Sequence, residues 1–220
     1  VEKWDYLVSP NRFSTEKFKS AFKYEGKFLE VGYPRNDELL KNYYDLDTLK
    51  NDLNIDKNKK VLLYTPTFRE NNFDKNGKYL AEIELDIRLL GKLNPDWIIL
   101  VIKHYLIKNN FKRTNNIIDV SSYYSLNKLF LVSDVLLTDY SSVMFDFSIL
   151  NKPIMFYAYD LDEYKNDLRG FYLDYEKDLP GKNFLDTNEI SISLNKILTN
   201  AIIISASGMG TGGRVVHHLE

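Results

Sequence analysis

Four short runs dominated by apolar residues constrain the fold of this chain more than any other feature of its sequence. They lie at residues 61–64, 97–103, 134–138 and 153–157. A continuous apolar run is typical of a strand buried on both faces, because a half-exposed strand alternates apolar and polar residues. Stretches with helical spacing lie between the runs, at 79–93, 125–131 and 141–150. This alternation predicts an α/β fold in which a parallel sheet carries helices on both faces.

The rest of the chain supplies further expected elements. The spacing of Phe18, Ala21 and Phe22 predicts a helix that Ser14 caps. A turn cluster follows at 32–36. The remaining expectations are strands at 4–8, 28–31 and 117–120, helices at 37–53 and 188–199, and a polar loop at 69–78.

The length and pattern predict one Rossmann-like domain over residues 1–204. A chain of 220 residues is long enough to bury a substantial core. Residues 205–220 are glycine-rich and break the pattern, and the terminal Leu-Glu looks like a cloning junction. We therefore interpret 205–220 as a non-native or disordered tail and leave it out of the fold.

Composition excludes several functional classes. The chain has no cysteine, which rules out disulfides, thiolate metal sites and a cysteine nucleophile. Its formal charge is −2, so no overall field favours nucleic acid. The apolar runs are far shorter than the roughly 20 residues of a membrane-spanning helix. We therefore expect a cytoplasmic protein that does not bind nucleic acid.

Polar residues follow the predicted strands, where parallel α/β sheets bind their ligands. Asp139 to Ser142 come directly after the strand at 134–138 and open a helix. The hydroxyls of Ser141 and Ser142, with the free N–H groups of a helix start, suit a phosphate. The alternative is that these serines only cap the helix.

Basic residues follow two other predicted strands. Lys103 ends the run at 97–103 and His104 follows it, and Thr67 and Arg69 follow the run at 61–64. Histidine can donate a hydrogen bond to a phosphate oxygen, and arginine offers a planar fork for the same group. A surface histidine and a solvated loop arginine are the alternatives. If these residues meet Ser141 and Ser142 at one edge of the sheet, they suit a diphosphate.

Acidic residues follow the last predicted strand. Asp160 and Glu163 lie in this segment, and Arg169 comes soon after. Together with Asp139 they are candidates for contacts to a nucleotide, because carboxylates can bind ribose hydroxyls. They could instead hold a divalent metal or begin a solvated helix. The segment lacks the glycine and spacing of a calcium loop, so we expect no metal site and no cofactor.

Several segments resemble one known family. The run at 132–146 resembles the CDP-glycerol glycerophosphotransferases, which are the teichoic-acid primases and polymerases. Further resembling segments, in the same order as in the family, lie at 32–35, 64–69, 152–157, 159–164 and 169–175.

The resemblance implies a function and a two-domain GT-B fold, of which this chain is the C-terminal, donor-binding half. The family transfers glycerol phosphate from CDP-glycerol to a hydroxyl of a lipid-linked polymer, and CMP leaves. By resemblance, His104 is the catalytic residue, Lys103 belongs to the same basic motif, and Ser141 and Ser142 form the phosphate-binding helix start. Arg69 matches an arginine that lines the donor cleft.

The chain also departs from the family pattern. Tyr105 stands where the family has proline after the histidine, and Lys182 replaces the second proline of a later turn. The N-terminal acceptor domain is missing, so we expect this chain to be inactive alone. The family works at the inner face of the cell membrane, which implies peripheral association. Two alternatives remain: a GT-B half that uses CDP-ribitol or a sugar nucleotide, and a non-catalytic flavodoxin-like binding module.

Overall fold

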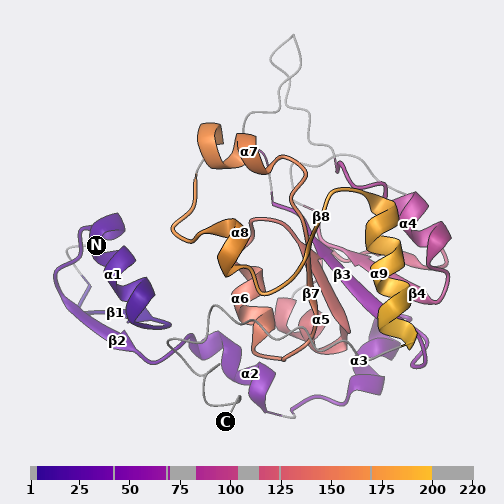
Figure 1. Cartoon of the computed structure of the whole chain (residues 1–220). Helices are drawn as coiled ribbons and strands as arrows, with labels where there is room; N and C mark the ends of the chain where they lie inside the picture. Colours follow the sequence, from indigo (N-terminus) through magenta and orange to yellow (C-terminus); the bar gives the residue numbers. More distant parts are fainter. Residues whose placement is uncertain are drawn as a thin grey trace, which may run out of the picture.

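A six-stranded parallel sheet forms the centre of the protein (Figure 1). The computed structural model describes residues 4–41, 43–67, 69, 83–103, 114–123, 125–168 and 170–199. The strand order is β5-β4-β3-β6-β7-β8. Their bounds are β3 (Lys60–Thr65), β4 (Trp97–Val101), β5 (Ile117–Asp119), β6 (Val135–Thr138), β7 (Ile154–Tyr157) and β8 (Asn183–Phe184). All neighbouring strands pair in parallel, which confirms the predicted sheet.

Helices cover both faces of this sheet. Alternate residues of β3 enter opposite cores: Val61 and Leu63 enter one, and Leu62 and Tyr64 enter the other. This double burial explains why the strand reads as a continuous apolar run. The first core packs under α3 (Leu46–Asp52), α5 (Leu126–Val132) and α6 (Val143–Ser148), and the second under α4 (Ile87–Leu93) and α9 (Thr187–Thr199).

The strand order reverses between β3 and β6. From β3 the chain proceeds outward through β4 and β5, then returns to the other side of β3 and continues through β6, β7 and β8. Such a reversal opens a crevice outside the carboxyl ends of the two central strands, where α/β sheets bind ligands. The loops that follow β3 and β6 are therefore where a site is expected.

A small lobe lies beside the main sheet (Figure 1). It consists of β1 (Tyr6–Ser9), α1 (Arg12–Phe22) and β2 (Lys27–Glu30), with β1 and β2 parallel to each other. The predicted Ser14 cap is wrong: the side chain of Asn11 accepts the N–H of Ser14 at 2.9 Å and caps α1. A connector at 31–36, which ends in the 3₁₀ turn η1 (Pro34–Asn36), leads to the main body.

Two predicted helices differ from the structure. The segment 37–53 forms α2 (Asp37–Leu40) and then α3, because Lys41 is extended and Asp45 starts a new helix by accepting the N–H of Thr48. The helix predicted at 79–93 begins at Ile87 in the part that the structure describes, where Asp86 caps it. Residues 70–82 and the tail at 205–220 lie outside the described residues.

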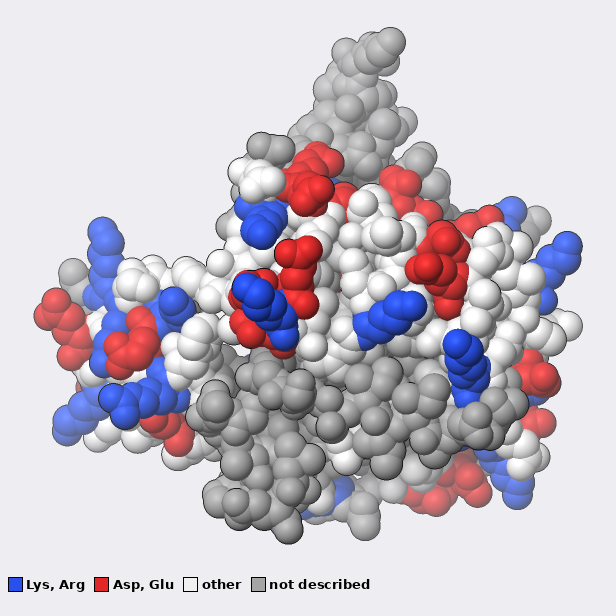
Figure 2. Space-filling model, in the orientation of Figure 1, with Lys and Arg blue, Asp and Glu red and all other residues white. Residues whose placement is uncertain are grey.

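Among the described residues, three short helical elements follow β7, and of these only a helix start near Asp160 and Glu163 was among the sequence interpretations. They are α7 (Leu161–Glu163), the π-helical turn η2 (Tyr164–Leu168) and α8 (Tyr175–Asp178). Lys, Arg, Asp and Glu side chains are interspersed over the face that Figure 2 shows, in keeping with the near-neutral charge. Within the described ranges, each helix is too short or too polar to cross a lipid bilayer.

Lys152 closes the end of α5. Its ammonium donates to the carbonyl oxygens of Leu131 at 2.8 Å and Ser133 at 2.6 Å. Lys152→Met is expected to lower the free energy of unfolding by about 1–3 kcal/mol, because partly buried carbonyl oxygens that lose their donor carry a cost of that order. Urea unfolding measures this loss. The exposed Lys57, changed to Met, is the control and should unfold like the parent; an equal loss in both variants would contradict the capping role.

Candidate functional site

The carboxyl ends of β3 and β6 are joined by their last side chains. The hydroxyl of Thr138 donates to the carbonyl oxygen of Thr65 at 2.8 Å, and the two hydroxyl oxygens lie 3.1 Å apart. Both residues are buried. The loops that begin at Pro66 and Asp139 therefore leave the sheet side by side, at the point where the strand order reverses.

Asp139 ties these two loops together. Its carboxylate accepts the N–H of Thr67 at 2.8 and 3.0 Å and the N–H of Tyr140 at 2.7 Å. Its carbonyl oxygen accepts the hydroxyl of Tyr175 at 2.9 Å. Only 3% of Asp139 is exposed, so its carboxylate binds groups inside the protein and not solvent.

Arg69 links both loops to a third one. Its Nε lies 2.6 Å from Oδ2 of Asp160, and its Nη2 lies 3.0 Å from an oxygen of each of Asp160 and Asp139. Its Nη1 donates to the carbonyl oxygen of Thr67 at 2.7 Å. Asp160 follows β7, so the set of Arg69, Asp139 and Asp160, called here the Arg69 network, joins the loops after three neighbouring strands.

Aromatic rings enclose the Arg69 network. The guanidinium carbon lies 4.8 Å from the ring centre of Tyr140, 5.3 Å from that of Tyr164 and 5.6 Å from that of Tyr159. The rings of Tyr140 and Tyr164 stack at 3.8 Å, and the hydroxyl of Tyr140 donates to Asp160 at 2.9 Å. Rings that exclude water strengthen the ion pairs inside them.

Burial and charge act against each other in this network. Burial raises the pKa of Asp139, and the neighbouring Arg69 opposes that rise. Burial disfavours the charged guanidinium, but the hydrogen bond that it donates to Asp160 and the charge of Asp139 together raise the pKa of Arg69. Burial and the bond to Asp160 raise the pKa of Tyr140, so its hydroxyl stays a donor.

The network changes the interpretation of three candidate residues. Arg69 is predicted to bind phosphate, and Asp139 and Asp160 to contact a nucleotide. In the structure these residues bind one another, and with both carboxylates ionised the set carries one more negative than positive charge. We therefore assign them to holding the loops in place, and direct ligand contact by them stays a prediction.

Lys103 follows β4 and is also engaged. Its Nζ lies 2.6 Å from Oδ2 of Asp119, at the end of β5, and its N–H donates to Ser121 at 2.8 Å. Burial alone would raise the pKa of Asp119, but bonds from Lys103 and Ser121 hold it below its usual value. Lys103 therefore fixes the exit of β4, and its role toward phosphate stays a prediction.

The serine pair stands at the beginning of α6. The hydroxyl of Ser141 accepts the N–H of Val143 at 3.4 Å, and Ser142, in the N-cap position, is exposed and makes no side-chain cap bond. The buried hydroxyl oxygen of Thr67 has no hydrogen-bond partner in the part of the chain that the structure describes. These three hydroxyls belong to the two loops at the reversal point. Glu163 is exposed at the end of α7, and His104 and Arg169 lie outside the described residues.

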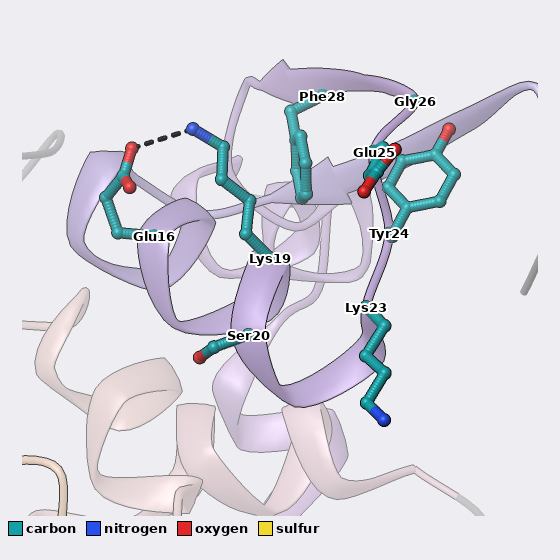
Figure 3. A pocket seen from close by; sticks show the side chains of 8 residues that line it. All are labelled: Glu16, Lys19, Ser20, Lys23, Tyr24, Glu25, Gly26 and Phe28. Carbon is teal, nitrogen blue, oxygen red and sulfur yellow. Dashed lines mark hydrogen bonds and ion pairs between the residues drawn. The ribbon is translucent and has the colours of Figure 1, made fainter.

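A hollow elsewhere in the molecule is not part of this site. An open hollow of about 590 Å³ lies in the lobe, lined by eight residues that include Glu16, Lys19, Tyr24 and Phe28 (Figure 3). Lys19 is already paired with Glu16 at 2.9 Å, and the hollow is not at the strand ends.

Among the residues that the structure describes, no three His, Asp or Glu side chains are placed to hold a metal ion.

The aromatic surroundings of Arg69 were missed from sequence. Tyr140, Tyr159, Tyr164 and Tyr175 all lie within segments that carry the family resemblance, which was a usable signal. Because an aromatic residue in such a segment is ordinarily part of the core, the signal does not reveal that rings surround a charged group.

Comparisons with known proteins agree on one family. The profile of the CDP-Glycerol:Poly(glycerophosphate) glycerophosphotransferases matches residues 1–202. A teichoic acid poly(glycerol phosphate) polymerase of Staphylococcus epidermidis is 47% identical over 205 residues, which are 90% of this chain and 28% of that protein. A teichoic acid glycerol-phosphate transferase of Staphylococcus aureus is 47% identical over 186 residues, which are 82% of this chain and 48% of that protein.

A solved structure has the same arrangement. A structure of the wall teichoic acid polymerase TagF, soaked with CDPG, superposes with a TM-score of 0.79 at 40% identity. The match covers 99% of this chain and 57% of that one. The chain thus spans between 28% and 48% of the length of the two curated relatives named above.

Proposed function

The chain belongs to the CDP-glycerol:poly(glycerophosphate) glycerophosphotransferase family, and on that premise we propose that it is the donor-binding half of an enzyme that transfers glycerol phosphate. The donor is CDP-glycerol, and the acceptor is a hydroxyl of a teichoic-acid-type polymer. One observation carries the proposal: the loops after β3 and β6 leave the sheet together where the strand order reverses, which is where such sheets bind nucleotides. The TagF structure soaked with CDPG supports the choice of donor.

The hydroxyls of Thr67, Ser141 and Ser142 bind the donor diphosphate in this proposal. Buried polar groups are normally paired, so the hydroxyl of Thr67, which has no partner among the described residues, fits a residue whose partner is a ligand. Ser142 makes no side-chain cap bond and is exposed. Hydrogen bonds to a charged phosphate are stronger than bonds between neutral groups.

The reaction is a displacement at phosphorus. The acceptor oxygen forms a bond to the phosphorus of the glycerol phosphate, the bond from that phosphorus to CMP breaks, and the acceptor hydroxyl loses its proton. Phosphoryl transfer depends mainly on positioning and on stabilising charge. His104 donates a hydrogen bond to the transferred group or the leaving oxygen. The Arg69 network keeps the loops in place, so that they need not reorganise during the reaction.

In this proposal, the acceptor polymer binds to a domain that is not among the residues of this chain. The base that takes the acceptor proton comes from an N-terminal acceptor domain, as the family resemblance implies. Because the acceptor polymer is linked to lipid, the enzyme works from the cytoplasm at the inner face of the membrane. No metal or cofactor is required, because the hydroxyls and His104 supply the donors that the phosphate needs.

Calorimetric titration with CDP-glycerol tests the donor site, with CMP and UDP as comparison ligands. The parent chain is expected to bind CDP-glycerol selectively. The double variant Ser141→Ala/Ser142→Ala should weaken binding at least about tenfold, because one hydrogen bond to a charged group contributes about 1.5–3 kcal/mol. Ser148→Ala, at the other end of α6, is the matched control and should bind like the parent.

Each other outcome points to a different conclusion. Equal affinity for UDP would favour a sugar-nucleotide donor, and tighter binding of CDP-ribitol would favour the ribitol alternative. Binding that survives the double serine substitution would move the phosphate site elsewhere. If neither this chain nor a longer form that includes the acceptor domain binds a cytidine diphosphate, the proposal is wrong.

A further inference from the structure

The connector at 31–36 contacts the middle of α6, at a position that the donor site does not use. The connector between the lobe and the main body carries Arg35 and Asn36, and both bind Asp146 in the middle of α6. Nη2 of Arg35 lies 3.0 Å from Oδ2 of Asp146, and Nε lies 3.3 Å from the same oxygen. The side-chain amide of Asn36 donates to Oδ1 of Asp146 at 2.6 Å. The Asp146 side chain is 13% exposed, so it lies largely under the connector.

The connector is shaped for this contact. Gly32 has a φ of +77°, a conformation that other residues rarely adopt, and it turns the chain out of β2. The guanidinium carbon of Arg35 lies 4.1 Å from the ring centre of Tyr33, so the ring holds the guanidinium in place. The side-chain amide of Asn127, on α5, donates to the carbonyl oxygen of Arg35 at 2.5 Å. The connector is thus fixed to two helices of the main body.

Among the described helices and strands, those of the lobe make few contacts with those of the main body. Nζ of Lys17 lies 5.3 Å from the ring centre of Phe13, within the lobe, and 5.3 Å from that of Tyr172, in the main body. Large apolar side chains of the lobe remain exposed, among them Tyr6 and Leu29. Contacts between polar or charged groups, including those of Asp146, therefore have a large part in setting where the lobe lies.

We propose that Asp146 is a positioning residue that sets the orientation of the lobe relative to α6. Because α6 begins beside Ser141 and Ser142, the same short helix carries the donor-phosphate hydroxyls at its start and the attachment of the lobe in its middle. The link to the donor rests on the proposed function; the link between Asp146 and the lobe does not. Asp146 keeps the lobe at a fixed angle to the donor site.

Distances between two spin labels test this proposal. The chain has no cysteine, so Ser20→Cys on α1 and Asn188→Cys on α9 give one label in the lobe and one in the main body. Both residues are exposed. The parent pair is expected to give one narrow distance distribution by double electron–electron resonance. Asp146→Ala should broaden it about twofold or split it, because a hinge of a few residues can absorb a large backbone change.

Controls separate positioning from loss of structure. Asp96 pairs with Lys59 on the surface, and Asp96→Ala should leave the width of the distance distribution unchanged. Arg35→Ala removes the same ion pair by deleting its more exposed partner, and it should also broaden the distance distribution. This variant keeps the proposal testable if Asp146→Ala does not fold. The exchanged pair Arg35→Asp/Asp146→Arg should narrow the distribution again.

The distance measurement uses no nucleotide, so its result is independent of whether the donor binds. A parent-like narrow distribution in folded Asp146→Ala and in Arg35→Ala would overturn the proposal. Broadening in both variants, with thermal unfolding midpoints close to that of the parent, would support it, because a purely structural role would lower the midpoint without moving the lobe.

Discussion

Asp139→Ala is expected to lower the free energy of unfolding by about 3–5 kcal/mol, because it leaves a buried guanidinium without one of its two carboxylates. The side chains of Asp139 and Arg69 are 5% and 11% exposed, so water cannot replace the lost partner. The substitution also leaves the N–H groups of Thr67 and Tyr140 without their acceptor.

Urea unfolding followed by circular dichroism measures this effect, and the chain offers a matched control. Asp96 also pairs with a basic residue, but its side chain is 73% exposed. Asp96→Ala should therefore change the free energy of unfolding by less than about 1 kcal/mol. Asp139→Asn keeps an oxygen for the N–H of Thr67. Its free energy of unfolding should therefore lie between that of the parent and that of Asp139→Ala. A loss in Asp139→Ala no larger than that of Asp96→Ala would contradict a structural role for the Arg69 network.

The sheet could be predicted from sequence because its strands are buried on both faces. Val61 to Tyr64 are each at most 3% exposed, and a strand in that environment has to be apolar throughout. The order of strands and helices then requires parallel pairing. β8 was missed because its two residues, Asn183 and Phe184, are too few to form a recognisable pattern.

Helix boundaries were less accurate where a polar side chain competes for the backbone. Asp45 and Asp86 each accept an N–H three residues later and start a helix there. The apolar spacing continues across both positions, so periodicity alone predicts longer helices. Helix spacing reports which face is buried, whereas caps decide where the helix begins.

The candidate site can be located by one topological rule, but its internal pairing cannot. The rule that ligands bind beyond the strand ends selects Thr67, Asp139, Ser141 and Ser142 from the order of strands and helices alone. It cannot show that Arg69 binds Asp160, which lies 91 residues further along the chain. Charge and residue type identify candidates for both ligand contacts and ion pairs, and only their positions in space separate the two.

His104→Ala is expected to lower kcat about 10²–10³-fold in a form of the protein that turns over CDP-glycerol, because removing one donor to a developing charge has that effect in comparable sites. His104 lies outside the described residues, but it directly follows Lys103, whose N–H and ammonium group are both held at the exit of β4. Steady-state kinetics measure the loss. His217→Ala, in the glycine-rich tail, is the matched control and should leave kcat unchanged.

A second substitution at this position separates two chemical roles. His104→Gln keeps an N–H donor but cannot exchange a proton near neutral pH, so it should recover much of the lost rate if His104 acts by donating a hydrogen bond. A rate as low as that of His104→Ala would indicate proton transfer instead. Equal losses in kcat and kcat/KM would mark an interaction made only in the transition state, whereas a raised KM alone would mark simple donor binding. Unchanged turnover in His104→Ala would remove His104 from the mechanism and leave the hydroxyls of the loops after β3 and β6 as the groups that stabilise the phosphate.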